Sequence, residues 1–181
     1  MSEKYNSEMN IRKILISEKE IQNKLSEAGN FINQIYDGKP VLLVSILKGG
    51  FVFLADVVRK VHVPCEIGFM TAQSYFDQTS SSGHVEITMD LQQNISEYHV
   101  VLIEDIIDTG RTLSEIMKLL QSRNPLSLHM ITLLDKPSRR VINCKPDLAL
   151  FQIPDVFVVG YGMDYGEKYR NLPYIAELQA N

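Results

Sequence analysis

Short apolar runs alternate with helix-like segments along this chain, and this alternation restricts its fold more than any other feature. The run PVLLVSIL (40–47) is continuously apolar, which is typical of a strand covered on both faces. Further strands are expected at 63–70, 84–91, 98–107, 127–134, 147–151 and 157–161. Strands separated by helical segments at this interval form βαβ units, so the sequence predicts an α/β fold with a mostly parallel sheet.

The first helix has a clear beginning and end in the sequence. Ser17 and Glu20 form the S-x-x-E pattern of a capping box. Apolar residues then follow at spacings of four and three, which predicts one buried stripe made of Ile21, Leu25, Ala28, Ile32 and Ile35. Asp37-Gly38-Lys39-Pro40 ends this helix. Helical patterns return at 51–61 and 114–123, and the irregular tail at 164–178 could hold a final strand.

The length favours a single domain over residues 1–181. Charge and cysteine content indicate its partners and its compartment. The net charge of −4 gives no general attraction to nucleic acid or anionic lipid. No apolar run approaches the ~20 residues of a transmembrane helix, and the N-terminus is not a secretory signal. Cys65 and Cys144 stand alone, as free thiols do in a reducing cytosol. We therefore expect a cytoplasmic protein with no membrane or nucleic-acid partner.

Two groups of polar residues can be interpreted without a catalytic or metal-binding role. The segment TAQSYFDQTSSSGH (71–84) is polar and serine-rich, which predicts a long mobile loop between two strands. The histidines lack the spacing of metal ligands and are interpreted as packing or surface residues, at positions 62, 84, 99 and 129.

The segment VVLIEDIIDTGRTL (100–113) places three acids where a buried strand ends, although buried charges are costly without partners. Ligands of open parallel sheets bind beyond the carboxyl ends of the strands, so Glu104 and Asp105 should face such a ligand. The turn at 108–112 offers backbone N–H groups, two hydroxyls and a helix N-terminus, which suit a phosphate. Carboxylates accept from ribose hydroxyls or hold Mg²⁺. The alternative is a set of solvated acids with Asp108 as a helix cap.

The segment IEDIIDTGRT (103–112) resembles the phosphoribosyl-diphosphate motif of the purine phosphoribosyltransferases. The resemblance extends over roughly residues 12–178 and is greatest to the bacterial hypoxanthine or hypoxanthine-guanine enzymes. SILKGGFVFLADVVR resembles the diphosphate loop of that family, and QSYFDQTSSSG resembles its mobile catalytic loop. LLDKPSRR resembles the base-contacting segment, and PDVFVVGYGMDYGEKYRNLPYIAEL resembles the C-terminal purine hood.

This resemblance implies a type I phosphoribosyltransferase fold, with a central, mostly parallel sheet flanked by helices. A small hood would be built from approximately residues 1–16 and 140–181. The implied reaction joins hypoxanthine, and guanine as well, to 5-phosphoribosyl 1-diphosphate. The products would be IMP or GMP and diphosphate, with Mg²⁺ as the cofactor. The resemblance also implies a homodimer or homotetramer.

The resemblance assigns a role to each matching residue. Asp108 would be the general base near purine N7. Contacts to ribose and the 5′-phosphate would come from Glu104, Asp105, Asp108, Thr109, Gly110, Arg111 and Thr112. Diphosphate would be bound by Lys48, Gly49 and Arg170, after a cis peptide at Leu47-Lys48. The purine would be bound by Lys136, Phe157, Val158 and Asp164. Metal ligands would be Glu104, Asp105 and Asp164. Val159 and Tyr161 are expected to be core residues.

Lys136 would donate to the purine 6-oxo group, which would favour hypoxanthine and guanine over adenine. Ser74 and Tyr75 would begin the mobile loop, which closes over the reacting atoms in this family. Gly162 and Gly166 stand where other members carry side chains, which predicts a looser hood. Gln73 replaces a lysine found in some relatives.

Two other functions are open to the same fold. An RNA-binding regulator resembling the pyrimidine-operon attenuators would need a basic face, and this chain has few positive charges to build one. A non-catalytic nucleotide-binding module would leave the acids at the strand end without a purpose.

Overall fold

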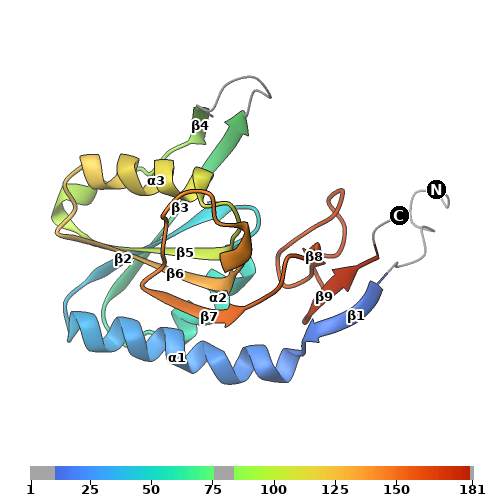
Figure 1. Ribbon diagram of the computed structural model, residues 1–181. Helices are drawn as coiled ribbons and strands as arrows, with labels where there is room; N and C mark the ends of the chain where they lie inside the picture. The colour runs from blue at the N-terminus through green and yellow to red at the C-terminus, as the bar shows by residue number, and fades with distance from the viewer. Residues whose placement is uncertain (1–10, 76–83, 180–181) are drawn as a thin grey trace, which may run out of the picture.

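A computed structural model describes residues 11–75 and 84–179 of the chain. Two β-sheets form the framework, as Figure 1 shows. The large sheet has the strand order β4-β3-β2-β5-β6-β7, and the small sheet has the order β1-β9-β8.

The strands of the large sheet are parallel except at one edge. Its members are β2 (Val41–Leu47), β3 (Cys65–Tyr75), β4 (His84–Met89), β5 (His99–Ile107), β6 (Ser127–Asp135) and β7 (Leu148–Gln152). Only β4 runs antiparallel, against the end of β3. The predicted α/β fold with a mostly parallel sheet is confirmed.

Helices cover both faces of the large sheet, which explains its continuously apolar strands. The first two helices lie on one face, and the third lies on the other (Figure 1): α1 (Glu18–Tyr36), α2 (Phe51–Val57) and α3 (Arg111–Ser122). Alternate residues of β5 point to opposite faces. Val101 and Ile103 join the core beneath α1 and α2, whereas Val100 and Leu102 join the core beneath α3. Fully burying each such side chain contributes about 1.5–3 kcal/mol. Three short 3₁₀ turns complete the helical segments, at Val58–Lys60, Ile95–Glu97 and Pro137–Arg139.

Helix α1 begins as predicted but buries a different last residue. Both hydrogen bonds of the Ser17–Glu20 capping box are present. The predicted burial of Ile35 is wrong, because its side chain is 38% exposed while Tyr36 is 2% exposed. The Tyr36 hydroxyl contacts two residues of β6, at 3.1 Å from Ser127 Oγ and 3.0 Å from His129 Nδ1.

The small sheet joins the two ends of the described chain. Its strands are β1 (Ile11–Ile16), β8 (Val158–Val159) and β9 (Ile175–Leu178), and β9 pairs antiparallel with both neighbours. The carboxylate of Glu177 is almost buried and lies 2.6 Å from the guanidinium of Arg12. Within 140–181, β7 belongs to the large sheet, so the small sheet takes its C-terminal strands from the later part of this segment.

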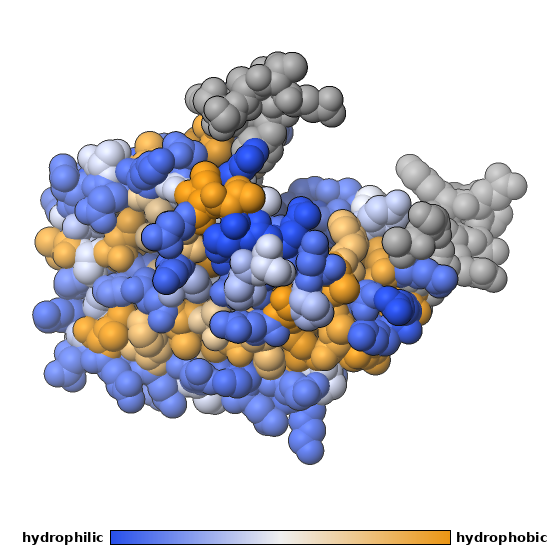
Figure 2. All heavy atoms as spheres, in the orientation of Figure 1, coloured by the Kyte–Doolittle hydropathy of each residue, from blue (hydrophilic) through white to orange (hydrophobic). Residues whose placement is uncertain are grey.

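Several predicted boundaries are wrong, and two of them lie in segments assigned to the site. Residues 71–75 were expected to be loop but continue β3, because β4 pairs with them. Helix α3 begins at Arg111 instead of Ser114, so its first residues lie within the segment 108–112 that was expected to be a turn. Hydrophilic residues cover most of the face seen in Figure 2, with apolar patches between them. In the described ranges no helix is both long and apolar enough to cross a membrane.

Candidate active site

The carboxyl ends of β2, β5 and β6 meet a hollow of about 350 Å³, which the loop between β8 and β9 helps to enclose. The hollow is lined by Lys48, Gly49, Asp105, Ile106, Asp108, Lys136, Phe157, Val158, Met163, Asp164 and Arg170. All of these except Ile106 and Met163 were predicted site residues. The fold therefore brings together residues more than one hundred positions apart.

Two neighbouring acids, Glu104 and Asp105, follow the buried apolar residues 100–103 of β5. Glu104 is 5% exposed, and its Oε1 accepts a hydrogen bond of 2.9 Å from the backbone N–H of Ile46. Burial, together with the charge of Asp105, raises the pKa of Glu104 above its usual range. Burial raises the pKa of Asp105 to about 6. Burial therefore makes the charged form of both carboxylates costly unless a cation lies beside them.

The turn at 108–112, called the phosphate turn below, is shaped by glycine and by a neighbouring segment. Gly110 is the N-cap residue of α3 and has φ +80°, a left-handed conformation that suits glycine. The carbonyl of Thr109 accepts hydrogen bonds from the N–H groups of Val141 and Ile142, at 3.1 and 3.3 Å. Arg111 and Thr112 open the first turn of α3. The turn thus leads directly into a helix N-terminus, where backbone N–H groups bind anions.

The side chain of Asp108 faces the hollow and does not cap α3, whose cap has no side-chain hydrogen bond. Its Oδ1 accepts a 2.9 Å hydrogen bond from Arg139 Nε, and its Oδ2 lies 3.7 Å from Lys136 Nζ. The carboxylate is 39% exposed. Arg139 also lies 3.6 Å from Asp155 Oδ1. Neither Arg139 nor Asp155 was predicted, because nothing in the local sequence indicates that Arg139 contacts Asp108 or that Asp155 contacts Arg139.

Lys136 is buried beside Asp108 and does not lie on the surface. The residue is 6% exposed, and its backbone N–H donates to the carbonyl of Ile107 at 3.0 Å. A buried ammonium group is retained where it has a charged partner. The geometry thus aims a pure hydrogen-bond donor into the hollow.

An exposed aromatic ring forms one wall of the hollow. Phe157 is 55% exposed, and its ring meets that of Tyr165 edge to face, with centroids 5.7 Å apart. Val158 is buried in β8. The core positions predicted for Val159 and Tyr161 are confirmed. Tyr165 was not predicted, because an aromatic residue in an irregular segment has no periodicity to reveal its direction.

The loop at residues 48–50, which resembles the diphosphate loop of the family, packs tightly against Asp105 on one side and Gly162 on the other. The peptide bond between Leu47 and Lys48 is cis, as the resemblance implied. A Cβ atom at Gly49 would overlap the carboxylate of Asp105, and a Cβ atom at Gly162 would overlap the carbonyl oxygen of Gly49. The expectation that Gly162 loosens the hood is therefore wrong, because the absence of a side chain allows close contact there.

Arg170 and Asp164 occupy the facing side of the hollow. The Arg170 guanidinium donates to the carbonyl of Gly162 at 2.8 Å and lies 2.9 Å from Asp164 Oδ1. Asp164 also adds to the negative field at Asp105. Cationic and anionic groups thus lie side by side on this side of the hollow.

Comparison with known proteins decides the family. Residues 11–166 match the model of the phosphoribosyl transferase domain. The chain belongs to the phosphoribosyltransferase family. It is 46% identical, over 94% of this chain and 95% of the relative, to the hypoxanthine-guanine phosphoribosyltransferase of Staphylococcus epidermidis.

Solved structures of the family share the whole fold. A hypoxanthine phosphoribosyltransferase from Staphylococcus aureus superposes with a TM-score of 0.90 at 45% identity, covering 94% of this chain and 92% of that one. A hypoxanthine-guanine phosphoribosyltransferase from Bacillus anthracis gives 0.89 at 41% identity, covering 93% and 99%. The architecture of this phosphoribosyltransferase is thus the type I fold.

The predicted mobile loop of this phosphoribosyltransferase is described only at its ends. Ser74 and Tyr75 are the last residues of β3, and their backbones pair with Val85 and His84 of β4. Residues 76–83 lie outside the described ranges.

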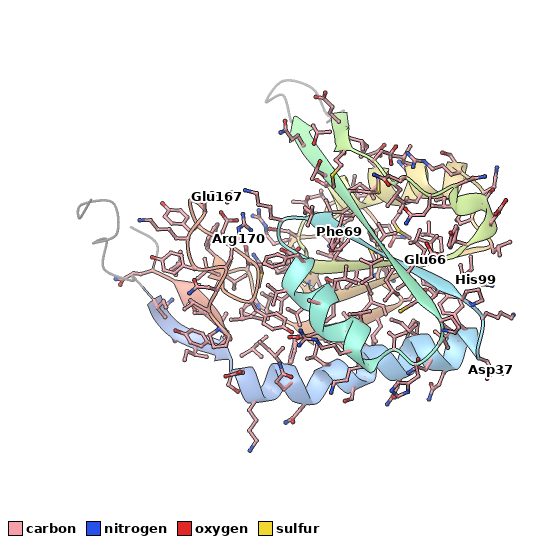
Figure 3. All side chains as sticks on the ribbon, turned by 180° about the vertical axis from the view of Figure 1, so that it is seen from behind. Asp37, Glu66, Phe69, His99, Glu167 and Arg170 are labelled. Atoms are coloured by element: carbon pink, nitrogen blue, oxygen red, sulfur yellow. The ribbon has the colours of Figure 1, made fainter. Side chains whose placement is uncertain are left out.

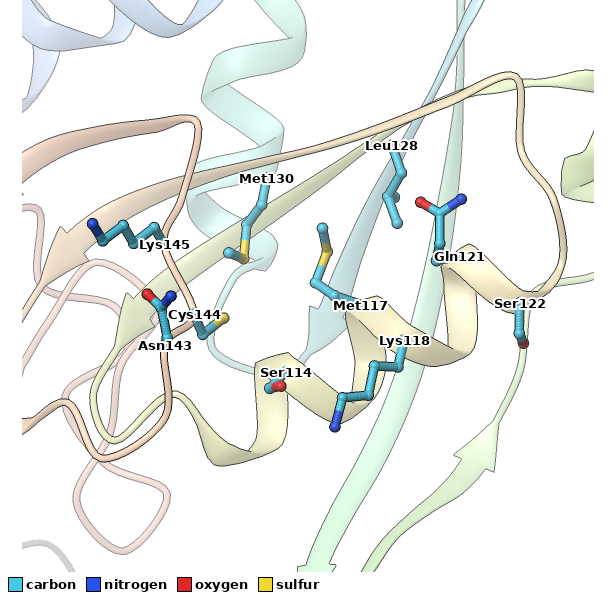
Figure 4. Close-up of a pocket in the computed structure, with 10 residues that line it drawn as sticks. All are labelled: Ser114, Met117, Lys118, Gln121, Ser122, Leu128, Met130, Asn143, Cys144 and Lys145. Atoms are coloured by element: carbon cyan, nitrogen blue, oxygen red, sulfur yellow. The ribbon is translucent and has the colours of Figure 1, made fainter.

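A larger hollow of about 590 Å³ lies beside α3 and contains none of the predicted site residues (Figure 4). Its floor is mainly apolar, with Met117, Leu128, Met130 and Cys144. Cys144 also packs near Gly110, so this hollow borders the reverse side of the phosphate turn. In this phosphoribosyltransferase the larger hollow is therefore distinct from the one that holds the acids.

Proposed function

We propose that this phosphoribosyltransferase is a purine salvage enzyme that uses hypoxanthine and guanine. It would transfer the phosphoribosyl group of 5-phosphoribosyl 1-diphosphate and form IMP or GMP together with diphosphate. The observation that carries this proposal is the buried Lys136 beside Asp108, in one hollow with the phosphate turn and an exposed aromatic ring. The names of the relatives support the same substrates.

The choice of base follows from the chemistry of Lys136. An ammonium group donates hydrogen bonds and cannot accept them. The 6-oxo group of hypoxanthine or guanine accepts such a bond, whereas adenine has an amino group at that position. The ring of Phe157 offers a stacking surface, which contributes roughly 1–3 kcal/mol in comparable base–aromatic contacts.

Asp108 is positioned to take up the proton that the purine loses. In the transfer, purine N9 forms a bond to C1′ of the ribose as the bond from C1′ to the diphosphate oxygen breaks. The electron pair of that bond leaves with the diphosphate. The N7 proton passes to the Asp108 carboxylate, which is oriented by Arg139 and Lys136.

The phosphate groups of the donor meet separate parts of the site. The amides of the phosphate turn would hold the 5′-phosphate at the N-terminus of α3. Lys48 and Arg170 would hold the diphosphate, and the guanidinium of Arg170 suits a bidentate contact.

The acids of the site would bind Mg²⁺ only together with a substrate that supplies phosphate oxygens as further ligands. Among the described residues, no three His, Cys, Asp or Glu side chains come close enough together to hold a metal ion. Mg²⁺ commonly takes one or two carboxylates and completes its shell with phosphate oxygens and water. Glu104 and Asp105 would hold one ion beside the ribose hydroxyls, and Asp164 would hold a second ion at the diphosphate. The bound ion would offset negative charge on the leaving diphosphate.

The exposed apolar face of β3 would form the contact between two or more copies of the chain. Ile67 and Phe69 are 43% and 38% exposed on that strand, and Phe51 at the start of α2 is 41% exposed. Figure 3 shows Phe69 on this face. We propose a homodimer or homotetramer built through it. Sedimentation equilibrium should then give a multiple of the 20.6 kDa chain mass, and a monomer at micromolar concentration would contradict this.

Steady-state kinetics with four bases test the proposed function. Hypoxanthine, guanine, xanthine and adenine would each be supplied with the phosphoribosyl donor and Mg²⁺. We expect turnover with hypoxanthine and guanine and little with adenine. Turnover with adenine comparable to that with hypoxanthine, or no turnover with any base, would refute the proposal.

A further inference from the structure

Lys48 and Arg170, the two cations proposed to bind the diphosphate, are both paired with Glu167, an acid that does not line the hollow. Glu167 Oε2 lies 2.9 Å from Lys48 Nζ, and Glu167 Oε1 lies 3.2 Å from Arg170 NH2. Each oxygen of a single carboxylate therefore contacts a different cation. Two phosphate oxygens would make the same pair of contacts.

A tight turn places Glu167 at this point. Tyr165 and Lys168 exchange backbone hydrogen bonds of 3.2 Å, which leaves Gly166 and Glu167 at the tip. Both tip residues have positive φ, +59° and +64°. Such values are typical of tight hairpin turns but are disfavoured for a residue with a side chain. The backbone N–H of Glu167 donates to Asp164 Oδ2 at 2.8 Å, which ties the tip to the hollow.

The contacts of Glu167 can be exchanged for others because they lie in solvent. The side chains of Lys48 and Glu167 are 63% and 65% exposed, whereas that of Arg170 is 19% exposed. Exposed ion pairs are weak and are readily broken. Figure 3 shows Glu167 and Arg170 together, at the end of the molecule opposite to His99 and Asp37. A dissolved anion therefore reaches the same cations that Glu167 contacts.

We propose that the Glu167 carboxylate stands in for a phosphate group in the ligand-free enzyme and is displaced when a diphosphate binds. This inference rests on the proposed function, because it takes the diphosphate of the donor as the displacing group. Glu167 is then a positioning residue, which keeps Lys48 and Arg170 in place and competes with the diphosphate for them. Its return would assist the release of the diphosphate product.

Calorimetric titration of the full chain with magnesium diphosphate tests this competition without requiring turnover. Glu167→Gln removes the charge and keeps the side-chain size, so we expect the Kd for diphosphate to fall by about three- to tenfold. Glu167→Gly also removes the carboxylate and relieves the positive φ, so it should give the same tightening.

Glu27→Gln is the matched control, because Glu27 is an exposed acid in an ion pair with Lys24 at 2.5 Å on α1. It changes the net charge equally and should leave the Kd unchanged. A Kd that is unchanged or raised in both Glu167 variants overturns the inference. In both Glu167 variants the KM for hypoxanthine should stay the same. This separates displacement of the Glu167 carboxylate by diphosphate from a general loss of structure. Absence of turnover in the wild type would refute the proposed function, whereas the calorimetric result decides the role of Glu167 separately.

Discussion

The carboxylate of Asp108 is held between two cations at the end of a buried strand. Arg139 donates to one of its oxygens, and Lys136 lies beside the other. Because both partners come from the segment after β6, the orientation of Asp108 depends on a neighbouring strand and not on its own turn. A carboxylate fixed in this way can meet a purine nitrogen without first being reoriented.

Asp108→Asn tests the role of this carboxylate. The amide keeps the shape of the side chain but cannot take up a proton at neutral pH, so kcat should fall by roughly 10²–10⁴. The KM for the phosphoribosyl donor should change little. Asp155→Asn is a suitable control, because Asp155 also lies near Arg139 Nε, at 3.6 Å, but does not line the hollow. Unchanged turnover in Asp108→Asn would remove Asp108 from its catalytic role.

His99 lies at the start of β5, at the end of the sheet opposite to the hollow, and it should make the stability of the protein depend on pH. Burial lowers the pKa of His99, with smaller contributions from Lys39 and His129, while its Nδ1 lies 2.8 Å from Ser127 Oγ. The folded protein therefore takes up this proton less readily than the unfolded chain. The stabilisation is complete above the unfolded pKa of about 6.5 and is lost as the pH falls below it.

Urea unfolding at pH 7.5 and pH 5.5 measures this contribution. The free energy of unfolding of the wild type should fall on acidification relative to that of His99→Gln. The comparison with the variant is essential, because Glu104 and Asp105 have raised pKa values and favour the folded state at low pH in both proteins. Equal pH dependence in the two proteins would show that His99 does not contribute.

Single residues also show which parts of the site the sequence could reveal. The motif around 103–112 predicted the acids and the phosphate turn, because these residues are contiguous. The partners Arg139, Asp155 and Glu167 were not predicted, since their ion pairs join residues from distant elements. A contact between Lys48 and Glu167 leaves no periodic or local pattern in the chain.

At the scale of elements, two backbone segments determine the shape of the diphosphate end. The loop between β8 and β9 touches the diphosphate loop where Gly162 meets Gly49. Gly162 has φ +100°, and its backbone also holds Arg170 through hydrogen bonds in both directions. This contact couples the C-terminal loop to the loop after β2.

Gly162→Ala should separate these two segments. The added Cβ would overlap the carbonyl of Gly49, and the positive φ costs about 1–2 kcal/mol for an L-residue. We expect the KM for the phosphoribosyl donor to rise about tenfold, with a smaller change for hypoxanthine. Gly166→Ala is the control, because it also has positive φ but no atom lies within 4 Å of its added Cβ. Equal effects of the two variants would show that backbone strain, and not contact with Gly49, is responsible.

The elements with strong local patterns were predicted well, and the others were not. The apolar strands of the large sheet and the capped start of α1 follow from their sequences. Strand β1 was not predicted, because its partner β9 lies more than 150 residues away in the chain. The same limit applies to residues 71–75, whose strand depends on pairing with β4. At the end of α1, helical periodicity could not distinguish Ile35 from Tyr36, and tertiary hydrogen bonds favour the tyrosine.

At the scale of the whole molecule, the candidate active site lies between the large sheet and the C-terminal segment that carries β8 and the loop after it. The large sheet supplies the acids, the phosphate turn and Lys136, while the C-terminal segment supplies Phe157, Asp164 and Arg170. A substrate that contacts both parts would span the hollow between them. The chain carries a net charge of −4, so a highly anionic donor would need the local cations Lys48 and Arg170 to offset repulsion.

A crystal structure of the protein with bound inosine 5′-monophosphate tests the central claim most directly. We predict the 5′-phosphate against the backbone amides of residues 108–112, with the base stacked on Phe157 and its 6-oxo group at Lys136 Nζ. A nucleotide bound elsewhere, for example in the hollow beside α3, would contradict the assignment of the site.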